Sequence, residues 1–166
     1  STLDATHDAA IDGAPDLAVD LGKTDATIHD RGTPDIGFVM APVRITELMA
    51  KNEGAWVDEA GETDDWLELH NHTDDFVDLS MFEIADNNNE RHPLPRVLIE
   101  PNEYRILWAD NQTDQGTFHL PIKLSSSGET ISLWYQGEVA QRISYEGLGV
   151  NEALRIDEAG DWSRCR

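Results

Sequence analysis

Apolar and polar residues alternate along much of the chain after residue 43. Such alternation is typical of strands with one buried and one wet face, because successive side chains point to opposite faces of a sheet. Turn-forming residues separate the alternating runs. The pattern predicts strands at five places: 43–50, 66–72, 76–86 (broken near Ser80), 96–101 and 104–110.

Residues 130–146 predict a β-hairpin whose two strands meet at a turn at Gln136-Gly137. Apolar residues recur at alternate positions on both sides of that turn. Only 150–159 comes near a helical period, and weakly. The runs and turns together predict an all-β fold, an antiparallel β-sandwich of the immunoglobulin type. The inward residues predicted for the hairpin are Ile131, Leu133, Tyr135, Val139, Ile143 and Tyr145.

Residues 1–42 differ from the rest of the chain and predict an irregular lead-in to a domain at 43–166. Five aspartates from Asp4 to Asp20 recur at every fourth position. On a helix they would lie on one face and repel one another. Several glycines and prolines interrupt any long element. We therefore expect an acidic, turn-rich segment here.

The charge of the chain limits its partners. Its 166 residues include 33 acidic and 12 basic ones, which gives a net charge of −21. Such a surface repels phosphate backbones and anionic lipids, so we expect no nucleic-acid partner. No apolar stretch has the roughly 20 residues that a membrane helix needs, so we expect no membrane insertion. The charge favours solubility in a salty medium or, alternatively, the collection of cations.

The loop before the second strand is the best candidate for a metal site. Calcium takes roughly 6–8 oxygen ligands, and a flexible acidic loop can supply them. The alternative is structural: Asp64 and Asp65 cap the start of a strand. The acidic runs 85–90 and 109–114 are lesser candidates, and "DEAGE" (58–62) is echoed by "DEAGD" (157–161). The predicted calcium ligands are Asp58, Glu59, Glu62, Asp64 and Asp65.

No pattern of catalytic residues emerges. Glu47 and Glu68 lie on neighbouring predicted strands and could act as an acid–base pair, but ordinary hydrogen bonds to loop amides or arginine explain them better. His70 and His72 face the same way and could share a metal, yet surface roles are more common. The single cysteine, Cys165, allows no internal disulfide and no zinc motif. We therefore predict no catalytic residues.

The five tryptophans suggest a binding surface. Trp66 and Trp108 are expected in the core. Trp56 and Trp134 fall on the opposite face from their apolar neighbours and are the predicted ligand-binding residues. An exposed indole can stack on a sugar ring or anchor a protein partner. The alternative is that both pack within the sandwich.

Four stretches, "DWLELHN", "VDLSMFEIAD", "IEPNEYRILWA" and "KLSSSGETISLW", resemble the bacterial lamin-tail domain, an immunoglobulin-like β-sandwich. The resemblance runs from about Val43 to the end of the chain. One departure is the loop "DEAGETDD", where that family often has an Asp-Gly-Asp turn. A second, shorter resemblance links "DAAIDGAPD" and "HDRGTPDIGFVMAP" to the closing stretch of secreted right-handed β-helix proteins.

The resemblance implies a non-catalytic binding or attachment module of an exported bacterial protein, extracellular or at the cell surface. Its partner would be a protein or a cell-surface polymer, and calcium would stabilise the acidic loop. Two alternatives stay open. One is a carbohydrate-binding module, and the other is the C-terminal part of a larger polysaccharide-acting β-helix enzyme.

Overall fold

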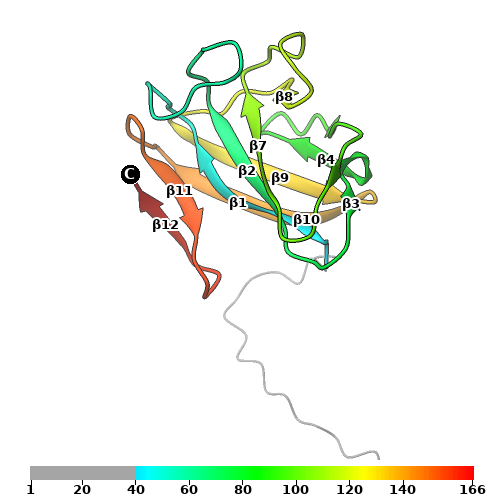
Figure 1. The fold of residues 1–166 in the computed structure, drawn as a ribbon. Coiled ribbons are helices and arrows are strands. Elements are labelled where there is room, and N and C mark those ends of the chain that lie inside the picture. Colours follow the sequence, from blue (N-terminus) through cyan, green and yellow to red (C-terminus); the bar gives the residue numbers. More distant parts are fainter. Residues whose placement is uncertain (1–39) are drawn as a thin grey trace, which may run out of the picture. The chain divides into compact units, whose positions relative to one another are not determined.

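The computed structural model describes residues 40–166, and the compact unit that contains them runs from Ile36 to Arg166. The predicted acidic lead-in, with its resemblance to a β-helix ending, therefore lies almost wholly outside the described residues. The described residues form strands and one short 3-10 helix (Figure 1): β1 (Val43–Met49), β2 (Trp66–Asn71), β3 (Val77–Asp78), η1 (Leu79–Met81), β4 (Phe82–Ala85), β5 (His92–Pro93), β6 (Leu98–Ile99), β7 (Tyr104–Ala109), β8 (His119–Leu120), β9 (Gly128–Tyr135), β10 (Glu138–Glu146), β11 (Ala153–Ile156) and β12 (Trp162–Cys165).

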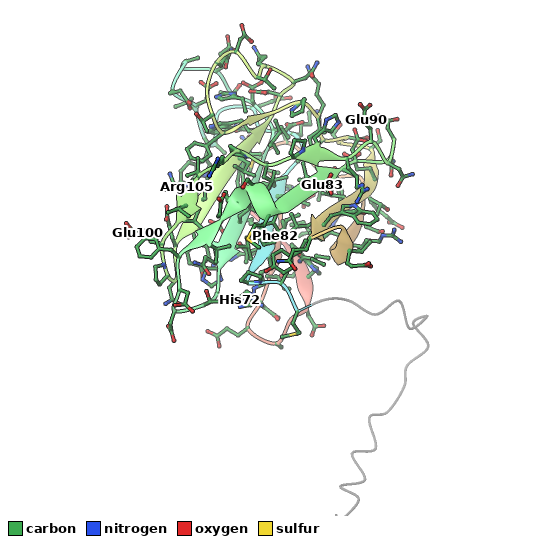
Figure 2. The ribbon with its side chains drawn as sticks, turned by 90° about the vertical axis from the view of Figure 1, so that its right-hand side faces the viewer. His72, Phe82, Glu83, Glu90, Glu100 and Arg105 are labelled. Carbon is green, nitrogen blue, oxygen red and sulfur yellow. The ribbon has the colours of Figure 1, made fainter. Side chains whose placement is uncertain are left out.

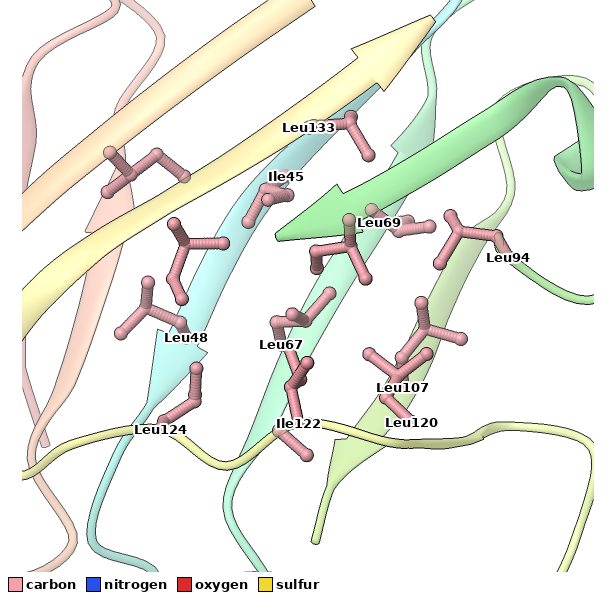
Figure 3. Packing of buried hydrophobic residues seen from close by; sticks show 14 of the residues in the cluster. Ile45, Leu48, Leu67, Leu69, Leu94, Leu107, Leu120, Ile122, Leu124 and Leu133 are labelled. Atoms are coloured by element: carbon pink, nitrogen blue, oxygen red, sulfur yellow. The ribbon is translucent and has the colours of Figure 1, made fainter. Parts of the chain in front are cut away.

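Two layers of sheet enclose the hydrophobic core, which confirms the predicted all-β sandwich. The larger sheet has the strand order β12-β11-β1-β2-β7-β8, the smaller one facing it has the order β10-β9-β4-β5, and β3 pairs with β6 as a separate two-stranded sheet. All pairs are antiparallel except β7 with β8. Leu67 and Leu69 of β2 face Leu133 of β9 across the core (Figure 3), and all three are fully buried.

The break predicted near Ser80 is the 3-10 helix η1, between β3 and β4. The Asp78 carboxylate accepts a hydrogen bond from the Ser80 backbone N–H at 2.9 Å, so the helix begins with a side-chain cap. The sequence predicts no helix at 150–159, where the helical period is weak, and this segment supplies β11, which pairs with β1. Pairing with an existing sheet edge outweighs a weak local helical preference.

The predicted hairpin at 130–146 is confirmed as β9 and β10. Its turn has φ +51° at Gln136 and +86° at Gly137, the two positive values that a type I′ hairpin turn requires. The inward placement of Val139 is wrong. A β-bulge shifts the register between Val139 and Gln141, so Val139 pairs with Trp134 on the outer face. One extra residue in a strand reverses which face the following side chains occupy.

The side chain of Gln141 joins the two sheets. Its Oε1 accepts the Ile45 N–H at 2.7 Å and its Nε2 donates to the Ile45 carbonyl at 3.0 Å. Ile45 lies at a register shift in β1, where the pairing with β2 is interrupted before Glu47. A glutamine amide on β10 thus takes the place of a neighbouring strand for this one residue.

A second apolar cluster lies on the outer face of the larger sheet. Met49, Trp66, Trp108 and Ala153 are buried there, apart from the main core. Trp66 and Trp108 were expected in the core between the sheets. They are buried but lie on the opposite face, because the inward positions of β2 and β7 belong to Leu67, Leu69 and Leu107.

Charged side chains occupy the surface of the sandwich. Figure 2 shows Phe82 in the middle of the molecule and Glu90 and Glu100 at its outline. In the described part of the chain, no helix is long and apolar enough to cross a membrane.

Replacing Leu67 with alanine should lower the free energy of unfolding by about 2–5 kcal/mol, because it leaves a cavity in the core. Leu98 is the matched control. It has the same side chain but is 60% exposed, so Leu98→Ala should change the free energy by less than about 0.5 kcal/mol. Urea denaturation of both variants measures the difference. Equal losses would mean that the two sheets do not enclose Leu67.

Candidate functional site

Two loops lie at the same end of the sandwich (Figure 1), and their residues pack on the outer-face cluster. The first, residues 50–65, joins β1 to β2 and places the Trp56 ring 6.3 Å from that of Trp66. The second, residues 110–118, joins β7 to β8 and leads to His119, whose ring stacks 6.5 Å from that of Trp108. The two tryptophans are buried because the loops fold back over them.

Asn52 fixes the shape of the first loop. Its Nδ2 donates to the carbonyls of Trp56 at 2.7 Å and Asp64 at 2.9 Å. Its Oδ1 accepts the N–H groups of Ala55 at 3.0 Å and Trp56 at 3.2 Å. Asn52 itself is only 5% exposed. One buried amide therefore holds both ends of the loop in place.

The two "DEAG" stretches adopt the same turn. In the first, Asp58 Oδ1 accepts the Glu62 N–H at 2.7 Å, and Gly61 donates to the Asp58 carbonyl at 3.2 Å. In the second, Asp157 Oδ1 accepts the Asp161 N–H at 2.9 Å, and Gly160 donates to the Asp157 carbonyl at 3.1 Å. They differ in surroundings: Asp58 is buried, whereas Asp157 is exposed.

Carboxylates from both loops gather around Asp58. One oxygen each from Asp58, Glu62 and Asp64 lie within 4.8 Å of one another, and Asp58, Asp110 and His119 form a second such group. Asp110 lies in the acidic run 109–114, which the sequence ranked below the first loop. His119 was missed, because it sits in a two-residue strand without any motif.

Electrostatic interactions shift the titration of this cluster. Burial and then the charges of Asp110, Asp58 and Glu62 raise the pKa of Asp64. Burial lowers the pKa of His119, but its hydrogen bond to Asp110 and the charges of Asp110 and Glu59 outweigh burial and raise the pKa overall. Hydrogen bonds from Gln115 and Gln112 lower the pKa of the exposed Glu62.

Two of the predicted ligands stand apart from the cluster. The Glu59 carboxylate is exposed and lies 3.4 Å from His119 Nε2. Asp65 accepts the Asn52 N–H at 3.3 Å, and burial raises its pKa to about 6. Its nearest charges besides Asp64 are Lys123 and Glu129. The structure thus brings together Asp58, Glu62 and Asp64 of the predicted set.

A groove of about 430 Å³ lies beside the first loop, on the outer face of the larger sheet. Trp56, which is 56% exposed, forms one wall. The buried Trp66 lies next to it. The groove is lined by Glu47, Met49, Ala55, Trp56, Trp66, Val150, Asn151, Ala153, Arg155, Cys165 and Arg166.

Trp134, the other predicted binding residue, is half-buried on the outer face of the smaller sheet. The guanidinium of Arg91 covers its ring at 4.6 Å and pairs with Glu83 at 3.2 Å. Its indole is therefore less accessible than that of Trp56.

The residues weighed for catalysis have structural partners. Glu47 and Glu68 face each other across β1 and β2, and Glu68 accepts the Thr46 hydroxyl at 2.7 Å. Burial, and then Glu68, raise the pKa of Glu47. His70 stacks on Tyr104 with ring centroids 4.0 Å apart, and His72 hydrogen-bonds the Ala41 carbonyl at 2.9 Å.

Asn52→Ala should lower the free energy of unfolding by about 2–6 kcal/mol, because it removes four hydrogen bonds, each worth roughly 0.5–1.5 kcal/mol. Asn88→Ala is the control, since the Asn88 side chain is exposed and makes one long bond to Asp86 at 3.3 Å. Thermal denaturation of both variants checks this. A control that falls as far as Asn52→Ala would contradict the role of the buried amide.

The lamin tail domain family model matches residues 39–147. No curated protein and no solved structure matches the chain. The resemblance, which was expected to run from about Val43 to the end of the chain, is thus shown as far as residue 147. The strands β11 and β12 lie beyond the match. The sandwich and the family match agree that the fold is immunoglobulin-like. This chain belongs to the lamin tail domain family, whose domain is a non-catalytic immunoglobulin-like module.

Proposed function

We propose that this domain attaches an exported bacterial protein, outside the cell or at its surface, to a polypeptide partner. The observation that carries the proposal is the groove beside Trp56, which combines an exposed indole with a largely apolar lining. Tryptophan is among the residues that most often supply binding energy at interfaces. Membership of a non-catalytic family favours binding over chemistry.

The surroundings of the groove favour an extended, basic peptide segment. β12, which contributes Cys165, is an edge strand of the larger sheet in the described part of the chain. An edge strand can pair with an added peptide, whose alternate side chains then fill a neighbouring pocket. The net charge of −21 attracts cationic partners. Within the groove, Glu47 is paired with Arg155 at 3.7 Å and Arg166 adds a second cation, so the preference for a basic partner comes from the net charge of the chain.

A carbohydrate ligand is the second candidate, and one observation favours it. A polar cleft of about 370 Å³ lies against β9 and β10, lined by Asp86, Asn87, Asn89, Thr130, Ser132, Arg142 and Ser144. Hydroxyl, amide and carboxylate groups of this kind suit the hydroxyls of a sugar. The third alternative, a polysaccharide-acting β-helix parent, rests on residues outside those described.

Trp56→Ala should weaken the binding of peptides selected from a random display library by about 30-fold or more, equivalent to about 2 kcal/mol. The selected peptides should be basic and carry an apolar anchor. Phe76→Ala is the control, since Phe76 is 62% exposed and lies outside the groove. Fluorescence titration measures each affinity.

Two results would contradict the polypeptide proposal. One is peptide binding that survives Trp56→Ala unchanged, which would place recognition elsewhere. The other is binding on a glycan array that Ser132→Ala or Arg142→Ala abolishes, with no peptide selected. That outcome would favour the carbohydrate candidate.

A further inference from the structure

We propose that the two end loops share a calcium ion, held by Asp58, Glu62, Asp64, Asp110 and Gln115. This site differs from the one expected within the first loop alone. It replaces Glu59 and Asp65 with two residues from the second loop, more than 40 positions further along the chain. The proposal goes beyond the groove and does not depend on what the groove binds.

Unpartnered buried oxygens point to a missing cation. Asp58 is only 8% exposed, yet its Oδ2 has no hydrogen-bond partner. Asp64 Oδ2 and Gln115 Oε1 are likewise buried without a partner. A buried polar atom left unpaired costs about 1–3 kcal/mol, and more where it is charged. The two aspartates each offer an oxygen within 4.8 Å of the other, and Gln115 is tied to the same group through Glu62, so a single metal ion would satisfy these oxygens together.

The balance of charges around these oxygens also favours a bound cation, because the negative charges are close together and have few positive partners. One oxygen each from Asp58, Glu62 and Asp64 lie within 4.8 Å of one another, and Asp58 and Asp110 belong to a second group with the same spacing. Within residues 40–166, no lysine or arginine forms an ion pair with any of these four carboxylates. Their one ion-pair partner there is His119, which bonds to Asp110. A divalent ion would offset the repulsion that remains.

The donor set selects calcium among the common metals. Carboxylate and amide oxygens are the ligands that calcium prefers, and it accepts the irregular geometry that two flexible loops provide. Zinc prefers nitrogen and sulfur. The only candidate nitrogen in either group is on His119: its Nδ1 is bonded to Asp110, and its buried Nε2, which has no hydrogen-bond partner, lies 3.4 Å from the Glu59 carboxylate. One nitrogen beside several oxygens is a poor match to the preference of zinc. Magnesium demands a near-ideal octahedron and holds its own water.

The remaining contacts show how the ligands are held in place. Gln112 and Gln115 donate to Glu62 Oε2 at 3.0 and 3.1 Å, which ties the second loop to the first. The Gln112 N–H donates to Asp110 Oδ1 at 2.8 Å. Each ligand is thus bonded across the two loops or anchored within one. A metal bound here would fasten together the cover over Trp66 and Trp108.

Calcium titration of the metal-free chain tests the proposal. Isothermal titration calorimetry should show one site. The melting temperature should rise by about 5–10 °C when calcium is about 100-fold above Kd. Asp58→Asn keeps the Oδ1 acceptor of its turn but should lower the affinity at least 10-fold. Without calcium, its melting temperature should equal or exceed that of the unmodified chain, because one repelling charge is gone.

Asp157→Asn is the matched control, because it removes one charge from the same turn in an exposed place. It should leave calcium affinity unchanged. Three outcomes would overturn the proposal. The first is no heat of binding and no change in melting temperature, either at a 10-fold molar excess of calcium or at about 10 mM calcium. The second is an equal loss of calcium affinity in Asp58→Asn and Asp157→Asn, and the third is an equal rise in melting temperature with magnesium at matched ionic strength. A shift with zinc but not calcium would also overturn it and assign the site to Asp58, Asp110 and His119.

Discussion

Two tryptophans are buried on the outer face of the larger sheet, away from the core. Covering them determines how the loops 50–65 and 110–118 fold. Trp66 and Trp108 pair across β2 and β7 on the face that points away from the core. Large aromatic side chains bury a large apolar area, and exposing both would cost several kcal/mol. The loops before β2 and after β7 therefore have to fold back over them. The acidic cluster and the groove at Trp56 both lie in or beside those loops.

Covering the tryptophans has a consequence for charge. The covering loops carry Asp58, Glu62 and Asp64 on one side and Asp110 on the other. Packing the loops over the same pair of rings brings these carboxylates together. The free energy gained by burying the rings therefore offsets the electrostatic repulsion between the carboxylates. The hydrogen bonds from Gln112 and Gln115 to Glu62 offset part of that cost. Three of its carboxylates come from the first loop, and the fold adds Asp110 from the second.

Much of the fold follows from the alternation of apolar residues, and the errors have physical causes. The strands, the break at Ser80 and the turn at Gln136-Gly137 are all readable, because local side-chain period and turn chemistry determine them. Val139 could not be placed, since a bulge is a property of the strand pairing. The face on which Trp66 lies was also predicted wrongly. Alternating side chains divide a strand into two faces, but they do not show that a loop will cover the outer one.

Only part of the candidate site could be predicted from the sequence, for a similar reason. Asp58, Glu62 and Asp64 are near neighbours in sequence, so composition alone singles them out. Asp110 and His119 join them only through the pairing of β2 with β7 and of β7 with β8. Parallel pairing of two short strands leaves no signal in a single sequence. Glu59 and Asp65 were counted because they are adjacent in sequence, but the Glu59 carboxylate lies exposed beside His119 Nε2 and Asp65 accepts the Asn52 N–H.

The acidic cluster and the groove lie differently with respect to the part of the chain that the family model matches. Residues 39–147 include both end loops, the outer-face tryptophans and every residue of the acidic cluster. The strands β11 and β12 lie after the match and extend the larger sheet beside β1. Ala153, Arg155 and Cys165, which line the groove, come from this extension. The matched part of the chain therefore supplies the wall at Trp56, whereas Ala153, Arg155 and Cys165 come from the hairpin that follows it, so the groove needs both parts while the acidic cluster lies wholly within the match.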